Sequence, residues 1–94
     1  MKKEITKEKL QKYFSITKEA LEKAEKAEKR FDMKVEAEDF LDMASRYYSD
    51  AEHFKTKGDY VLAYGALNYA HGWLDAGARI GLFKVTDNRL FTVD

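Results

Sequence analysis

The sequence has no cysteine and no proline, and each absence narrows what the chain can be. Without cysteine there can be no disulfide, no thiolate ligand for a metal and no cysteine nucleophile. Without proline, no residue forces an interruption in a helix. All five glycines fall between Gly58 and Gly81, so the first half of the chain can form long helices.

Long hydrophobic runs are also absent. No stretch approaches the roughly 18 apolar residues of a membrane-spanning helix. The first ten residues, MKKEITKEKL, lack the apolar centre of a signal peptide. We therefore expect a cytoplasmic protein with no membrane partner.

An excess of charge is missing too, since 17 Lys and Arg balance 17 Asp and Glu. Zero net charge gives no overall attraction to nucleic acid or to an anionic membrane, which argues against both as partners. Residues 1–34 carry eleven basic and seven acidic side chains, whereas residues 35–94 carry six and ten. A basic first helix lying against an acidic remainder would explain this asymmetry, but a solvated face of mixed charge is the interpretation we favour.

What is present suits one helical domain spanning residues 1–94, with 45% hydrophobic residues to build its core. Apolar residues recur at spacings of three, four or seven from about residue 6 to 31, which predicts an amphipathic helix. Its expected apolar face includes Leu10, Phe14, Leu21, Ala24 and Phe31. Residues 32–35 contain no helix breaker, and we place an interruption there because one helix of about fifty residues is unusual in a globular domain.

Two further helices are expected, over residues 35–57 and 59–82. Gly58 suits the left-handed position that follows a helix, and Asp59 is a good N-cap for the next one. The remaining tail includes Leu90 and Phe91 and is too apolar for a disordered end, so it should pack back on the bundle, with a short hairpin as the alternative. The predicted fold class is an all-α three-helix bundle with a short extended C-terminal tail.

The third predicted helix differs from the others, because no Lys or Glu occurs between Asp59 and Phe83. A helix with so few charges is expected to be buried on most sides. At 100° per residue, its polar residues fall within one arc of about 100°. These candidates for ligand or partner contact are Tyr60, Tyr64, Asn68, His71, Asp75 and Arg79, here called the polar stripe.

His71, Asp75 and Arg79 are spaced four residues apart, so neighbouring side chains can touch. They could contact a ligand, or they could form a structural network in which Asp75 pairs with Arg79 while His71 or Asn68 satisfies a backbone group. His71 and Asp75 offer two metal ligands where zinc needs at least three from protein. No metal site, no cofactor and no catalytic residue is therefore predicted.

Four glycines, Gly65, Gly72, Gly77 and Gly81, fall in or near the third helix. Each costs about 1 kcal/mol relative to alanine inside a helix, so their number calls for a reason. Close approach of another backbone would supply one. The neighbour could be another helix of the same chain or the third helix of a second chain.

The segment Tyr48–Phe83 contains Gly58-Asp59-Tyr60, the run NYAHGWLDAG from Asn68 to Gly77, and Gly81-Leu82-Phe83. In these features it resembles an archaeal family of small helical proteins known only as domain of unknown function 357. The similarity extends over nearly the whole chain. It implies a helical fold and an archaeal source, and it implies no activity and no catalytic residue.

Two weaker resemblances concern single elements. Residues between Ala51 and Ala70 are spaced like the packing residues of one tetratricopeptide hairpin, which implies shared hairpin geometry because stacked repeats are missing. Arg46 and His53 resemble the Arg and His pair of HEPN-type ribonucleases, which are also helical bundles. That resemblance implies His53 as acid or base and Arg46 on phosphate, but no basic stripe accompanies the pair.

The sequence leaves two function hypotheses. The first is a non-enzymatic interaction module, either homodimeric or docked on a protein partner through the third helix and through Tyr60, Tyr64, Tyr47 or Tyr48, since aromatic side chains often anchor interfaces. The second is a small-ligand or RNA-handling protein that uses the polar stripe.

Overall fold

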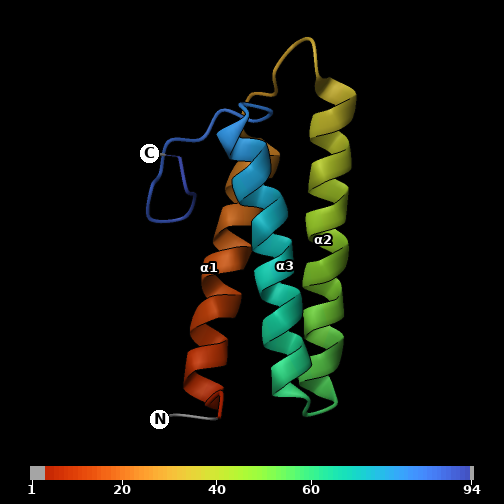
Figure 1. The fold of residues 1–94 in the computed structure, drawn as a ribbon, viewed down its shortest axis with the longest axis vertical. Helices are drawn as coiled ribbons and strands as arrows, with labels where there is room; N and C mark the ends of the chain where they lie inside the picture. The colour runs from red at the N-terminus through yellow and green to blue at the C-terminus, as the bar shows by residue number, and fades with distance from the viewer. Residues whose placement is uncertain (1–3, 94) are drawn as a thin grey trace.

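The computed structural model describes residues 4–93, which form three α-helices packed side by side (Figure 1). The helices are α1 (Lys7–Lys26), α2 (Lys34–Thr56) and α3 (Tyr60–Arg79). The predicted all-α three-helix bundle is confirmed. The ends of the predicted domain, residues 1–3 and 94, lie outside the described residues.

Helix α3 occupies the centre of the arrangement, with α1 and α2 on its two sides (Figure 1). Its contacts with α2 are the most extensive, and α1 touches α3 more than it touches α2. A tight turn joins α2 to α3, and the expectation for this turn is confirmed. Gly58 has φ +77°, and the Asp59 carboxylate accepts a hydrogen bond from the Leu62 amide at 3.0 Å.

Helix α1 begins as expected, with the Thr6 side chain accepting from the Lys9 amide at 3.1 Å. The expectation that this helix continues to residue 31 is wrong, because it ends at Lys26. The ammonium group of Lys29 turns back and donates to the carbonyls of Ala24, Glu25 and Ala27 at the end of α1. These contacts give the carbonyls at the end of the helix a side-chain donor, as is common at helix C-termini.

The segment after α1 runs extended beside the segment that follows α3. The Arg30 amide donates to the Leu82 carbonyl, and the Lys84 amide donates to the Glu28 carbonyl, each at 2.9 Å. Phe31 is 86% exposed, so its predicted place in the core is wrong. The spacing of apolar residues alone predicted a longer helix. In the structure, backbone hydrogen bonds between residues more than fifty positions apart hold this segment outside the helix.

Helix α3 ends at Arg79, three residues before the predicted limit. Gly81 has φ +76° and reverses the chain, so that Leu82 and Phe83 enter the core instead of continuing the helix. The Phe83 ring lies against Gly77, where a Cβ atom would overlap it. Gly77 therefore has a close neighbour in the same chain, but this neighbour is the Phe83 side chain and not the backbone of another helix that the sequence predicted.

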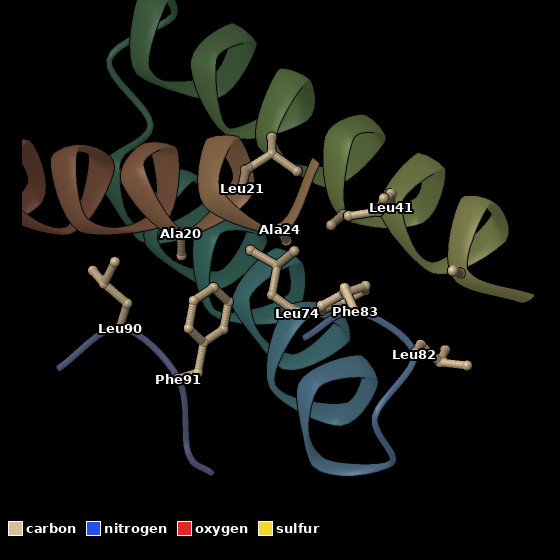
Figure 2. Packing of buried hydrophobic residues seen from close by; sticks show 11 residues of the cluster. Ala20, Leu21, Ala24, Leu41, Leu74, Leu82, Phe83, Leu90 and Phe91 are labelled. Carbon is tan, nitrogen blue, oxygen red and sulfur yellow. The ribbon is translucent and has the colours of Figure 1, made fainter. Parts of the chain in front are cut away.

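Two hydrophobic clusters hold the helices together. The cluster near the end of α3 unites all three helices with the tail (Figure 2), and its residues include Leu21, Leu41, Leu74, Leu82, Phe83, Leu90 and Phe91. The cluster at the other end consists of Leu10, Phe14, Ala51, Ala63 and Leu67. Leu90 and Phe91 are each only 2% exposed, so the prediction that the tail packs back on the bundle is confirmed.

None of the helices formed by residues 4–93 combines the length and the apolar character needed to cross a membrane.

Candidate interaction surface

The polar stripe does not form one site, because its members have different surroundings. His71 lies half-buried between α1 and the tail. Its Nε2 lies 2.6 Å from the Leu90 carbonyl oxygen, and its Nδ1 lies 3.2 Å from the Thr17 hydroxyl. Since a carbonyl only accepts, Nε2 carries a proton, and in the neutral ring Nδ1 accepts from Thr17. His71 thus links α1 to the tail.

Asp75, one turn further along α3, also holds the tail. Its Oδ1 accepts from the Thr92 amide at 2.9 Å, and its Oδ2 accepts from the Thr92 hydroxyl at 3.2 Å. The His71 ring nitrogen lies 3.8 Å from the same carboxylate. The network interpretation of the sequence therefore describes His71 well, since it satisfies a backbone carbonyl of the tail.

Tyr60 and Tyr64 are half-buried in the second cluster, where they pack between α1 and α3. The rings of Tyr13 and Tyr64 lie 5.1 Å apart at 55°, and a side-chain hydrogen bond with Tyr64 that stabilises the neutral Tyr13 hydroxyl raises the pKa of Tyr13 above its usual value. Tyr64 thus faces α1, and both tyrosines are half-buried rather than fully exposed interface anchors. Asn68 and Arg79, the other members of the stripe, are exposed.

Charged side chains fasten the tail to α1 beside this network. Arg89 donates to the Glu19 carboxylate, and Lys23 donates to Asp87 at 2.9 Å. The Arg89 hydrogen bond holds the pKa of Glu19 below its usual value, and the Lys23 hydrogen bond does the same for Asp87. These charges are solvated, so each pair contributes little alone.

The side of α3 that points away from α1 has no covering element among residues 4–93. We call this side, with the C-cap of the helix, the outer face of α3. Its exposed uncharged residues are Val61, Leu62, Gly65, Asn68, Tyr69, Gly72, Ala76 and Ile80, and the charged Arg79 lies at its C-terminal edge. Val61, Leu62 and Tyr69 are 68%, 50% and 54% exposed. The expectation that α3 is buried on most sides holds for 12 of its 20 residues, which are at least partly buried by the rest of the chain, whereas the outer face is left exposed.

Aromatic side chains from α2 and α3 border the outer face. The rings of Tyr47 and Tyr69 lie 4.3 Å apart, and those of Phe40 and Trp73 lie 5.0 Å apart, both edge to face. A shallow groove of about 330 Å³ runs beside them, lined by Phe40, Asn68, Tyr69, Gly72, Trp73 and Ala76. The outer face thus combines an aromatic rim with a small-residue floor.

Two glycines on this face test one of the two neighbours that the sequence allowed, another helix of the same chain. Apart from the adjacent residues and nearby backbone of α3 itself, no described atom lies within 4 Å of the place where a Cβ would stand at Gly65 or Gly72. Another helix of the same chain is therefore not the neighbour of either glycine. Both glycines leave open space on the surface of α3.

A family model described as "Protein of unknown function (DUF357)" matches residues 12–83, which are 72 of the 94 residues. The chain belongs to the DUF357 family. The family resemblance drawn from the sequence is confirmed. No curated protein and no solved structure matches the chain.

The DUF357 match includes every residue of the outer face, whereas the tail from Lys84 onward lies beyond it. The description of the family names no activity, so function has to be argued from the geometry. Tyr69, Phe40, Val61 and Leu62 were not among the residues that the sequence singled out. A signal was available in the helical wheel, where Val61, Gly65, Gly72 and Ala76 fall within one arc whose single charged residue is Arg79, near the end of the helix.

Residues 4–93 give little support to a ribonuclease pair or to a metal site. Arg46 forms an ion pair with Asp42 at 2.9 Å on the open surface of α2, and His53 is exposed with its ring 6.0 Å from that of Phe54. Within residues 4–93, no three His, Cys, Asp or Glu side chains converge on a possible metal position. A groove of about 510 Å³ between α1 and α2 has polar walls, and there Lys55 bonds to Gln11 at 2.9 Å.

Proposed function

We propose that this protein is a non-enzymatic interaction module that docks on a protein partner through the outer face of α3. The observation that carries the proposal is the chemical contrast of this face with the rest of the molecule. Charged residues make up 36% of the sequence, yet the outer face has none between Val61 and Ala76. Depletion of charge and enrichment of aromatic residues are what distinguish the centre of a protein interface from ordinary surface.

The cost of leaving this face in water supports the same function. Apolar surface disfavours water by about 25 cal/mol per Å², so side chains such as Val61, Leu62 and Tyr69 gain free energy when a partner covers them. Single exposed hydrophobic residues are common, but a continuous patch with an aromatic rim is typical of a binding surface. Tyr69 has the properties of an anchor, since its ring is large, rigid and half in solvent.

The polar stripe supports a ligand or RNA function less well. Both ring nitrogens of His71 and both carboxylate oxygens of Asp75 already have partners within the chain. A ligand at this place would have to displace the tail and expose Leu90 and Phe91. The interaction hypothesis requires no such rearrangement.

Site-directed photo-cross-linking in the native cells tests the proposal. A benzophenone amino acid at Leu62, on the outer face, is compared with the same amino acid at Ser49, which is exposed on the opposite side of α2. We expect an adduct with one protein, identified by mass spectrometry, from position 62 and not from position 49. Adding Gly72→Glu should abolish that adduct. Equal adducts from both positions, or none from position 62, would contradict the proposal.

A further inference from the structure

We infer that the partner is a second copy of this chain, bound so that two α3 helices lie antiparallel across a two-fold axis with each Tyr69 ring in the groove of the other copy. This inference rests on the proposed function, because it names the occupant of the same outer face. Three properties of the face support a copy of the chain over an unrelated protein: its shape, its lack of charge and its area.

The shape of the outer face is self-complementary. Tyr69 projects from it with 54% of its surface exposed, and the groove beside it has Gly72 in its floor with open space above. Residues three apart are neighbours on a helix, so the projection and the hollow lie next to each other near the middle of α3. A two-fold axis that passes between them brings each projection to the other hollow.

Four more residues of the face match in the same register, while Arg79, at the edge of the face, falls opposite Leu62. In an antiparallel helix pair, facing residues have position numbers with a constant sum. Placing Tyr69 opposite Gly72 therefore places Gly65 opposite Ala76 and Val61 opposite Ile80. Gly65 and Ala76 are both small, which allows close approach of the two helices. The larger side chains of Val61 and Ile80 then pack against each other at each end of the contact.

The absence of charge suits a symmetric interface. Near a two-fold axis each residue meets its own equivalent, so a charged residue there would face a like charge. The outer face has no charged residue between Val61 and Ala76, so pairing with a copy brings no such repulsion. A surface adapted to a charged partner would be expected to carry complementary charge.

The area is sufficient for a weak dimer. The 20 residues of α3 span about 30 Å, and the aromatic rim on α2 lies one interhelix distance away, about 8–10 Å. One interhelix distance plus one helix diameter of about 10 Å makes a strip roughly 30 Å by 20 Å, which gives about 600 Å² per copy, or about 1,200 Å² in total, the lower end for specific interfaces. We therefore expect a dimer that dissociates on dilution.

Sedimentation of the full chain from low micromolar to millimolar concentration tests the inference. The wild type should pass from monomer to dimer. Gly72→Glu places a carboxylate from each copy near the axis, and because position 72 faces open space the monomer should keep its circular dichroism spectrum. We expect this variant to dimerise at least about tenfold more weakly, a loss of about 1.4 kcal/mol. The matched control Ser49→Glu should dimerise like the wild type.

Engineered cysteines test the register, since the chain has none of its own. Gly65→Cys mixed with Ala76→Cys should form a mixed disulfide under mild oxidation, because the two positions face each other across the dimer. Within one α3 the same positions are about 16 Å apart and cannot be bridged. A dimer that forms no mixed disulfide would contradict the antiparallel register.

The failure of this inference can be distinguished from failure of the proposed function. A wild-type chain that stays monomeric at millimolar concentration, while position 62 cross-links to a different protein, would overturn the second copy and leave the interaction function standing. A monomer with no adduct from position 62 would overturn both. Equal dimerisation of the wild type and Gly72→Glu would place the dimer contact elsewhere and overturn the inference.

Discussion

The same substitution at two glycines of α3 should have opposite effects on stability. Gly72 and Gly77 lie five residues apart in one helix, and alanine is favoured over glycine at both by about 1 kcal/mol of helix propensity. At Gly72 the added methyl group meets open space, whereas at Gly77 it overlaps the Phe83 ring. Propensity therefore acts at both positions, and crowding acts at only one.

The magnitudes follow from these surroundings. Gly72→Ala should raise the free energy of unfolding by about 1 kcal/mol, and a chain of this size should then melt roughly 4–8 °C higher. At Gly77 the methyl group forces the Phe83 ring out of a packed position, which costs about 1–3 kcal/mol. Since the propensity gain is common to both variants, the difference between them isolates the crowding and should be about 1–3 kcal/mol.

Urea unfolding followed by circular dichroism measures this difference. The measurement is made at the lowest practical protein concentration, where self-association contributes nothing to the free energy of unfolding. The dependence on urea should be the same for both variants, because neither changes the surface exposed on unfolding. Equal stabilities of Gly72→Ala and Gly77→Ala would refute the reasoning, since they would mean that Phe83 does not occupy the space beside Gly77.

Three further outcomes test the tail and the end of α1. His71→Ala leaves a buried hydroxyl and a tail carbonyl without their partner, so it should lower the free energy of unfolding by about 1–3 kcal/mol and speed hydrogen exchange at the Thr92 amide. The pKa values of Glu19 and Asp87 lie below their ordinary values of 4.5 and 3.8 in the folded chain, so the stabilisation from their ion pairs is complete above those values and is lost as the pH falls through the lowered ones. Nuclear magnetic resonance shifts of the tail should therefore change below about pH 4, and an unchanged tail at that pH would argue against these ion pairs. Phe31→Ser should alter the free energy of unfolding by less than about 0.5 kcal/mol in urea, because the ring is exposed; a loss typical of a core residue would restore the longer first helix.

Local signals in the sequence were enough to predict the hairpin of α2 and α3. Gly58 and Asp59 define the turn through backbone conformation and capping, and both effects depend only on adjacent residues. The end of α1 depends instead on hydrogen bonds to residues 82–84 and on the ammonium group of Lys29. A helical pattern of apolar residues carries no information about such distant partners.

The candidate site was also predictable only in part. The sequence placed His71 and Asp75 correctly on one arc of α3, but their partners lie in a tail whose path depends on the whole fold. The outer face was missed for another reason. A helix with few charges was expected to be buried on most sides, whereas Tyr69 and its neighbours on the outer face are uncharged and exposed. Composition alone does not distinguish an apolar surface that is covered by its own chain from one that is exposed and available to another molecule.

The tail belongs to the part of the chain that must be present for the domain to fold on its own. A fragment limited to residues 12–83, the span that matches the family, would lose the Thr6 cap of α1. It would also lose the side chains of Leu90 and Phe91 from the hydrophobic cluster near the end of α3. Leu21 and Leu74 would then border an open cavity. The residues that match the family are thus fewer than the residues that complete the hydrophobic core of this protein. A stable recombinant domain should therefore include the tail.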